Sequence, residues 1–314
     1  MIGLIAGGGV RPHAADPPAL RVVTRDDPDR GDVLVFPRTL VVGIGAGGGT
    51  ERTEVLRLLA DTLEENGLAG SAVARLATVT GKADHPAVRW AASRLAGVAV
   101  DEHPPQLLAD VPVPNPSELV GAAVGTASVA EAAALASAPG GRLVVTKRKS
   151  ATATVAVARA AAVRGRLVVV GLGPAGTTDR LGARALAELR AASAVVGRPE
   201  AVEAVAGLLR PEPPRAAAAA SAAPTARTAW AAWSAWSASG AVPGAGGRVA
   251  PCVGEAVDGT GTAVDHVGAA AALAAHGHAV VLVALGDGAE PAVPPGPYEV
   301  HRAPRPATDA ARPV

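Results

Sequence analysis

The sequence is poor in cysteine and in aromatic residues, and both shortages narrow the classes of protein to consider. Cys252 is the single cysteine among 314 residues, which excludes an internal disulfide and a cysteine-rich zinc cluster. The histidines show no zinc-like spacing with carboxylates or with Cys252, so we predict no metal site. Aromatic residues make up only 2% of the chain. Val, Leu and Ala must therefore fill the cores, as in parallel sheets beneath alanine-rich helices.

The sequence also has little net charge and no long apolar run. Lys and Arg number 29 against 28 Asp and Glu, so no global field attracts nucleic acid or an anionic membrane. The opening MIGLIAGGGV lacks a basic region, and no stretch reaches the roughly 18 apolar residues of a membrane span. We expect a soluble, cytoplasmic protein without nucleic-acid or membrane partners, in which any charged ligand is bound locally.

Glycine is plentiful, and it twice follows a run of branched apolar residues. The two segments are Leu40 to Gly48 (LVVGIGAGG) and Leu167 to Gly176 (LVVVGLGPAG). Each pattern predicts a strand, a glycine turn and a helix start, which can present amide groups to an anion. Neither copy has the acidic residue that holds a ribose in dinucleotide-binding folds, which disfavours that function. Tight strand-to-helix turns without a ligand remain the alternative.

Two such copies in a chain of this length predict two α/β units with mainly parallel sheets. We divide the chain into a remnant or linker at 1–36, a first unit at 37–164 and a second unit at 165–290. The second unit contains a low-complexity insertion at 211–247, and a disordered tail follows at 291–314.

Local signals set the limits of several elements. Thr50 is the expected N-cap of a helix over 51–66, a strand is predicted over 143–146, and a helix is predicted over 178–192. Lys82 and the run Lys147 to Lys149 each follow a predicted strand. Cations at the carboxyl ends of parallel strands could bind a polyanionic small molecule, and a solvated turn is the alternative.

The order of motifs in the first unit resembles a known family. VVGIGAGGGT at 41–50, TGKADHP at 80–86, VPVPNPSE at 111–118, VGTASVAEAAAL at 124–135 and KRKSATATVAVAR at 147–159 are similar to the C-terminal domain of the cobalt-precorrin-5A hydrolase family of cobalamin biosynthesis. The resemblance implies a precorrin or cobalt-precorrin as the bound small molecule. We assign these residues to its site: Gly43, Gly45, Gly48, Thr50, Lys82, Asn115, Ser117, Lys147 and Lys149.

The second unit resembles the N-terminal domain of tetrapyrrole methylases, closest to precorrin-3B C-17-methyltransferase. The similar segments are GRLVVVGLGPAGTTDRLGARALAEL from 165 and AAALAAHGHAVVLVALGDG at 270–288. The resemblance implies S-adenosyl-L-methionine as cofactor. It places these residues around the cofactor: Gly171, Gly173, Pro174, Gly176, Gly286 and Asp287.

Together the two resemblances imply methyl transfer to a precorrin by a methylase half fused to a hydrolase-type domain. A non-catalytic corrinoid-binding or pathway-scaffolding protein is the alternative, and opening of a precorrin lactone is a third. Other corrin-pathway enzymes and a second copy of the chain are the expected protein partners. No Ser-His-Asp order or G-x-S-x-G elbow is present, and no catalytic residue is assigned.

Overall fold

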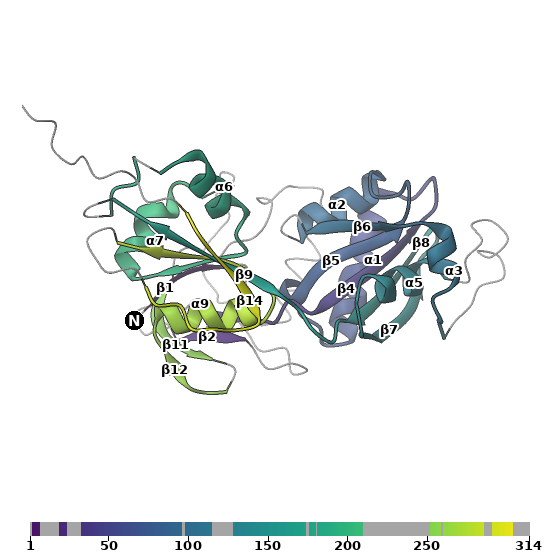
Figure 1. Ribbon diagram of the computed structural model, residues 1–314. Helices are drawn as coiled ribbons and strands as arrows, with labels where there is room; N and C mark the ends of the chain where they lie inside the picture. The colour runs from purple at the N-terminus through teal and green to yellow at the C-terminus, as the bar shows by residue number, and fades with distance from the viewer. Residues whose placement is uncertain are drawn as a thin grey trace, which may run out of the picture.

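The computed structural model describes residues 2–6, 19–23, 33–95, 98–114, 128–173, 176–179, 181–209, 252–258, 260–285 and 291–303. Helices and strands alternate along much of this part of the chain, and the strands form two sheets seen as separate lobes in Figure 1. The α/β class expected from the sequence is confirmed. Each sheet combines a parallel half with an antiparallel half, so it is less uniformly parallel than expected.

The middle of the chain forms a five-stranded sheet of order β6-β5-β4-β8-β7. Strands β4, β5 and β6 run parallel, whereas β8 and β7 are antiparallel to their neighbours. The strands are β4 (Leu40–Ala46), β5 (Val73–Val79), β6 (Ala99–His103), β7 (Arg142–Lys149) and β8 (Ala153–Arg159), and a short 3-10 helix at Gly70–Ala72 precedes β5.

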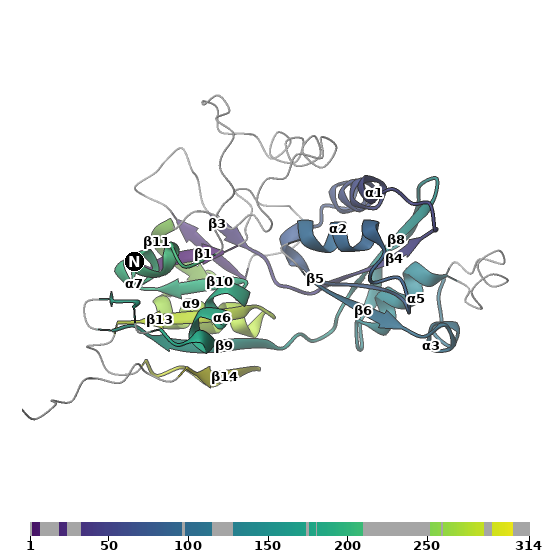
Figure 2. The same ribbon diagram turned by 90° about the horizontal axis from the view of Figure 1, so that it is seen from above.

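Helices cover both faces of the five-stranded sheet (Figure 2). Leu40, Val42 and Ile44 of β4 belong to the core beneath α1 and α2, and Val41 belongs to the core beneath α3 and α5. This double burial explains the nearly continuous apolar run of β4. The helices are α1 (Arg52–Glu65), α2 (Pro86–Arg94), α3 (Pro105–Ala109) and α5 (Val129–Ala136).

Gly43 in the middle of β4 allows α5 to lie directly on the sheet. A Cβ atom at this position would overlap the carbonyl oxygen of Ala130 and crowd the amide nitrogen of Ala134, both in the backbone of α5. Backbone atoms cannot move aside as a flexible side chain does. The close approach of helix and strand therefore requires glycine at residue 43.

The second sheet is built from both ends of the chain. Its order is β14-β9-β13-β10-β1-β11-β2-β3, and β12 pairs with β11. The four strands from β14 to β10 are parallel, and the pairs from β10 onward are antiparallel. The strands are β1 (Ile2–Ala6), β2 (Leu20–Val23), β3 (Val33–Val35), β9 (Gly165–Gly171), β10 (Ala194–Gly197), β11 (Cys252–Asp258), β12 (Ala263–Val264), β13 (Ala279–Ala284) and β14 (Tyr298–Arg302).

Two sequence-based expectations change with this sheet. Residues 1–36, interpreted as a remnant or linker, supply β1, β2 and β3 to the sheet of the second unit. The segment 291–314, expected to be a disordered tail, supplies β14, which pairs in parallel with β9. Neither pairing is visible from local sequence, because the partner strands lie far away along the chain. The domain limits themselves stay a prediction.

The larger sheet is also covered on both faces. Helix α9 packs on one face with Leu167, Val169 and Leu282, and helices α6 and α7 pack on the other with Val168 and Val170. Asp265 caps α9 by accepting a hydrogen bond from the amide of Gly268 at 2.7 Å. The helices are α6 (Ala183–Ala191), α7 (Pro199–Ala206) and α9 (His266–Ala275).

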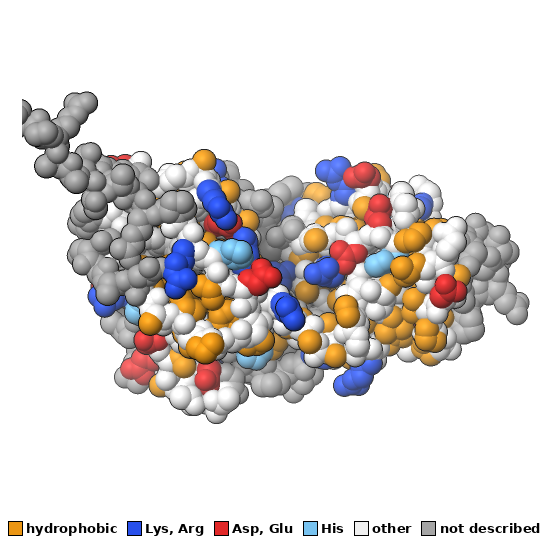
Figure 3. Space-filling model, in the orientation of Figure 1, with side chains coloured by type: hydrophobic (Ala, Val, Ile, Leu, Met, Phe, Trp, Pro, Cys, Tyr) orange, Lys and Arg blue, Asp and Glu red, His pale blue; other side chains and the backbone are white. Residues whose placement is uncertain are grey.

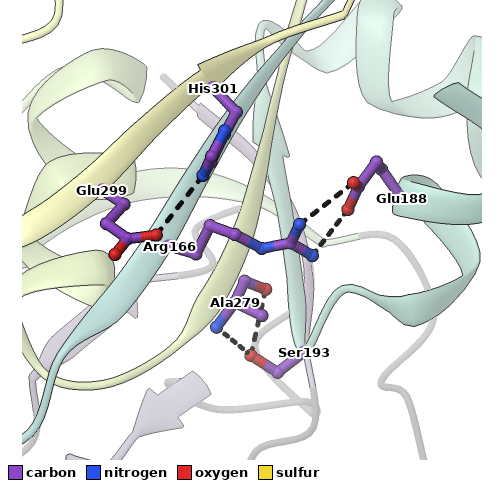
Figure 4. A network of polar contacts seen from close by, with 6 residues as sticks. All are labelled: Arg166, Glu188, Ser193, Ala279, Glu299 and His301. Atoms are coloured by element: carbon purple, nitrogen blue, oxygen red, sulfur yellow. Dashed lines mark hydrogen bonds and ion pairs between the residues drawn. The ribbon is translucent and has the colours of Figure 1, made fainter. Parts of the chain in front are cut away.

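A two-pronged ion pair fixes α6 to β9 (Figure 4). The Arg166 guanidinium donates to both carboxylate oxygens of Glu188, at 3.0 and 2.6 Å. Nearby, the Ser193 hydroxyl accepts a hydrogen bond from the amide of Ala279 at 3.1 Å and so joins the start of β10 to that of β13. These contacts join elements of one unit, and we assign them a structural role.

Along the chain, the five-stranded unit is inserted between β3 and β9, which are both strands of the larger sheet. Its two ends lie side by side, because Leu40 at the start of β4 pairs with Arg159 at the end of β8. The amide of Ala160 donates to the carbonyl oxygen of Thr39 at 2.9 Å and extends this pairing by one step. An insertion with adjacent ends leaves the host sheet undistorted.

His278 binds the segment that leads into the inserted unit. Its Nε2 lies 2.9 Å from the carbonyl oxygen of Phe36, and its Nδ1 lies 3.2 Å from the Ser193 hydroxyl. Burial is the main cause that lowers the pKa of His278 to about 4; the bond to Phe36 opposes this shift, and the charges of Arg38 and His276 add to it. The imidazole is therefore neutral near pH 7, with its proton on the nitrogen that faces the carbonyl.

The Gly43 contact can be tested with a matched pair of variants within one glycine motif. Gly43→Ala forces α5 away from β4 and is expected to lower the free energy of unfolding by about 3 kcal/mol. Gly48→Ala places its methyl group where no atom lies within 4 Å and is expected to change stability by less than about 0.5 kcal/mol. Urea unfolding of the full chain followed by circular dichroism measures both. Equal stability of the two variants would contradict the packing role of Gly43.

Candidate functional site

One edge of the five-stranded sheet gathers most of the predicted site residues that the structure describes. Strands β4, β5 and β6 are parallel, so their carboxyl ends, at Ala46, Val79 and His103, lie along one edge. Strand β8 begins opposite Ala46, and β7 ends at Lys149, so the β7–β8 hairpin closes there too. We call this region the carboxyl edge. Ligands of α/β sheets bind at such an edge.

The sequence contains three lysines, Lys82, Lys147 and Lys149, and the structure brings all of them to the carboxyl edge. Lys82 lies in the turn after β5, and Lys147 and Lys149 lie at the end of β7. No carboxylate in the described part of the chain forms an ion pair with the ammonium group of Lys82 or of Lys149. Two cations here are therefore available to a ligand.

The run Lys147 to Lys149 is strand rather than turn, because β7 continues to Lys149 instead of ending near residue 146. Alternation along a strand separates its side chains. Arg148 turns toward α1 and pairs with Glu65 at 2.5 Å, with both side chains half exposed. Lys149 stands opposite Thr154, whose hydroxyl lies beside Gly45 on the α5 side. Arg148 therefore has a structural role in its ion pair with α1, whereas Lys149 lies on the opposite, α5 side of the sheet.

The glycine motif that begins in β4 and continues into the turn after it is open only at its tip. Cβ atoms at Gly43 and Gly45 would overlap Ala130 and the hydroxyl of Thr154, so close packing explains both glycines. Gly48 and Gly49 are exposed, with no atom within 4 Å of an added Cβ. Of the glycines predicted to bind substrate in the first unit, Gly48 alone faces open space.

Thr50 is not the N-cap of α1. Glu51 occupies that position without a side-chain hydrogen bond, and the buried Thr50 hydroxyl instead donates to the carbonyl oxygen of Thr152 at 2.9 Å. The amide of Gly47 donates to the same oxygen at 3.0 Å. Thr50 therefore joins the glycine turn to the β7–β8 hairpin, a contact between residues 102 positions apart.

The carboxylate of Glu54 holds the β7–β8 hairpin against α1. It accepts hydrogen bonds from the Ser150 hydroxyl at 2.5 Å, the Thr152 hydroxyl at 2.7 Å and the Thr152 amide at 2.8 Å. These bonds, first that of Ser150, lower the pKa of Glu54 to about 2 from its ordinary 4.5. The carboxylate is ionised at neutral pH, and it fixes the hairpin that carries Lys149.

Two further carboxylates satisfy backbone amides at the carboxyl edge. Glu102 of β6 accepts from the amides of Lys82 and Ala83, at 2.9 and 2.7 Å. The buried Glu131, in the first turn of α5, accepts from the amide of Lys147 at 3.0 Å, where the register of β7 against β8 shifts. The chain's own carboxylates therefore use amides that a ligand anion could otherwise bind, and the lysine side chains are left as its donors.

Sequence reasoning missed a hydrogen-bonded pair at the same edge. His103, the last residue of β6, lies with its Nε2 2.6 Å from the hydroxyl of Ser137, which follows α5. Nor did the sequence point to Glu54, Glu102 or Glu131 as anchors. The usable signal was an acidic residue in the first turn of a helix, Glu54 in α1 and Glu131 in α5, which marks a helix start but not its distant partner.

Three described amides in the glycine segment after β9 already donate hydrogen bonds within the chain. The amides of Leu172, Gly173 and Gly176 donate to the carbonyl oxygens of Ala284, Thr177 and Gly173 respectively. Gly171 ends β9, and α6 begins only at Ala183 rather than near residue 178. These amides do not form a cradle for an anion, which is a poor fit to the predicted cofactor site.

Five predicted site residues lie outside the described residues: Asn115, Ser117, Pro174, Gly286 and Asp287. Within the described ranges, no group of three or more His, Cys, Asp or Glu side chains is placed to hold a metal ion. In the same part of the chain, the helices are too short or too polar to span a bilayer. On the face shown in Figure 3, basic and acidic side chains are interspersed rather than segregated.

Comparison with known proteins identifies the inserted unit. Residues 40–158 match the family described as "Cobalamin synthesis G C-terminus". These residues form a cobalt-precorrin-5A hydrolase-like domain. The resemblance found in the sequence is thereby confirmed for this range. The matched range ends before β9, so the methylase resemblance of the second unit stays a prediction.

Individual proteins are similar to part of this chain. A cobalt-precorrin-5A hydrolase of Priestia megaterium is 30% identical over 148 residues, which are 45% of this chain and 39% of that protein. The chain thus spans about two fifths of this curated relative. The solved structures include CobE, a protein from the cobalamin biosynthetic pathway, at 34% identity and a TM-score of 0.37 over 39% of this chain and 94% of that one. Cobalamin biosynthesis protein chiG from Agrobacterium tumefaciens has 28% identity and a TM-score of 0.30 over 39% of this chain and 98% of that one.

The role of Glu54 can be tested through the pH dependence of stability. A carboxyl whose pKa is lowered by folding stabilises the folded state above its unfolded pKa, and this contribution disappears as the pH falls through the folded pKa. Glu54→Gln is expected to lower the Tm at pH 7, and its Tm difference from wild type should shrink between about pH 4.5 and pH 2. Glu64→Gln, an exposed change on the same helix, is the control. A Tm difference that stays constant with pH would contradict the assignment.

Proposed function

We propose that the chain acts in cobalamin biosynthesis and that its hydrolase-like domain binds a precorrin or cobalt-precorrin at the carboxyl edge. The match of residues 40–158 to a cobalamin-synthesis family carries this proposal. The similarity to a cobalt-precorrin-5A hydrolase supports an enzymatic role on the same class of macrocycle. Since the chain spans only part of that relative, the opening of a precorrin lactone is a proposal for this chain.

The chemistry of the carboxyl edge suits such a ligand. Precorrins carry acetate and propionate side chains around the ring, and an ammonium group binds a carboxylate by a charge-assisted hydrogen bond. Lys82 and Lys149 have no acidic partner among the described residues. Lys82 lies in a turn that Glu102 holds in place, and Lys149 ends β7 beside the hairpin turn that Glu54 holds in place. Loops fixed in advance lose less conformational entropy when the ligand binds.

A second candidate function is methyl transfer from S-adenosyl-L-methionine by the second unit. One observation favours it. The two segments that resemble methylases form the neighbouring parallel strands β9 and β13, and a Cβ atom at Gly176 would lie 3.5 Å from Leu285. The engaged amides of the glycine turn argue against a preformed cofactor cradle. A non-catalytic corrinoid-binding or scaffolding role, with other pathway enzymes or a second copy as partners, is the alternative to both activities.

Calorimetry with S-adenosylhomocysteine separates these candidates. If the second unit is a methylase, the full chain should bind this product with a measurable heat at micromolar concentrations. Because the described amides of this segment are already engaged, weak binding or none is the expected result in the chain alone. A dissociation constant in the low micromolar range would show that the turn opens for the cofactor and would favour methyl transfer.

The lysine site can be tested with two stable corrinoids that differ in their side chains. Cobyrinic acid carries free carboxylates, whereas cobinamide carries amides at most of the same positions. Lys82→Gln and Lys149→Gln are each expected to weaken cobyrinic acid binding about tenfold, since one charged hydrogen bond contributes roughly 1.4 kcal/mol. Cobinamide should bind more weakly and respond little to either change. Titration followed by the visible absorption of the corrin measures both ligands.

Arg142→Gln is the matched control for the lysine variants. Arg142 is an exposed cation at the opposite end of β7 from Lys149. Its removal changes the net charge equally without touching the carboxyl edge. Equal dissociation constants for all three variants would contradict a lysine site and would indicate only general electrostatic attraction.

A further inference from the structure

Two guanidinium groups lie over one indole ring between α1 and α2. The central guanidinium carbon of Arg52 is 5.1 Å from the centroid of the Trp90 ring, and that of Arg94 is 3.9 Å away. Arg94 is almost completely buried, and burial and then the charge of Arg52 lower its pKa. Two guanidinium groups are thus held near one indole ring.

This cluster lies next to the carboxyl edge. Arg52 is the first residue of α1 and directly follows the glycine turn, while Pro86 begins α2 directly after the turn that contains Lys82. Trp90 is about one helical turn into α2, and long helical side chains lean toward the N-terminus of their helix. Arg52 and Trp90 therefore border the carboxyl edge on the side covered by α1 and α2.

Arg52 differs from the other cations of this region in what holds it. Its side chain is exposed, and its contact with Trp90 is its one polar or ring interaction within the described residues. By contrast, Arg148 pairs with Glu65, and Arg89 pairs with Asp84. A guanidinium in cation–π contact with an indole face still has N–H donors for a carboxylate, which its planar fork can bind through two parallel hydrogen bonds.

We propose that Arg52, oriented by Trp90, binds a carboxylate of the ligand at the carboxyl edge through two parallel hydrogen bonds. The inference rests on the proposed function for the identity of the ligand, a macrocycle with peripheral carboxylates. It adds a positioning contact on the α1 side of the edge to the lysines contributed by the β5 turn and the β7–β8 hairpin. The Arg52 guanidinium at one point and the lysine ammonium groups at others would both orient the ring and increase its affinity.

A purely structural role predicts a different outcome from the same substitutions. If Arg52 only packs α1 against α2, its replacement lowers the Tm and leaves ligand affinity unchanged. If Arg52 binds a carboxylate, Arg52→Gln weakens cobyrinic acid binding about tenfold, whereas Arg52→Lys keeps the charge, loses the planar fork and recovers only part of the affinity. Arg57→Gln, an exposed charge change one turn further along α1, should leave the affinity within twofold of wild type.

A second measurement does not depend on a corrinoid. The chain has four tryptophans, and the variant Trp230→Phe, Trp233→Phe, Trp236→Phe leaves Trp90 as the single indole. Titration of this variant with tricarballylate, a small tricarboxylate, should change the Trp90 emission in a saturable way. The same titration after the added change Arg52→Gln should give no saturable response.

The outcomes distinguish this inference from the proposed function. Cobyrinic acid binding that depends on Lys82 and Lys149 but not on Arg52 overturns the inference and leaves the function intact. Failure of cobyrinic acid to bind at all, with a saturable Arg52-dependent response to tricarballylate, overturns the function and supports a carboxylate site. Absence of an Arg52 effect with both probes overturns the inference.

Discussion

The antiparallel pairing of β4 with β8 is the contact on which the rest of the inserted domain depends. It extends from Leu40 opposite Arg159 to Ala46 opposite Ala153. At one end it brings the two ends of the domain together, where the larger sheet receives them. At the other end it places the β7–β8 hairpin beside the glycine turn. One ladder thus determines both how the domain is attached and where its candidate site is assembled.

The candidate site shows a division of labour among charged groups. The carboxylates of Glu54, Glu102 and Glu131 accept hydrogen bonds from backbone amides, so those amides need no water or ligand as an acceptor. Lys82 and Lys149 remain with their charges unpaired by any described carboxylate. Under the proposed function, such a site recognises an anion through side chains on a fixed turn and at a strand end, whereas the glycine motifs predicted a backbone cradle.

Local patterns in the sequence predicted the elements well and their partners poorly. The apolar runs at β4 and β13 and the Gly67 stop after α1 are local signals, and the structure contains them. Gly43 and Gly48 belong to the same glycine motif in the sequence, but Gly43 is required by close contact with the backbone of α5. The bond between Thr50 and Thr152 spans 102 positions, and no local pattern reports such a distance. The edge position of the lysines was predictable because carboxyl ends of parallel strands coincide.

The divided origin of the larger sheet has a consequence for synthesis on the ribosome. Among the described strands, β1 pairs with β10 and β11, and β2 pairs with β3 and β11. The inserted domain, complete by residue 159, can fold while the later strands are still untranslated. Strand β1 and one edge of β2 must therefore wait for partners that emerge more than 180 residues after them, whereas the other edge of β2 can pair with β3 at once. Protection of those edges during translation becomes a requirement of this topology.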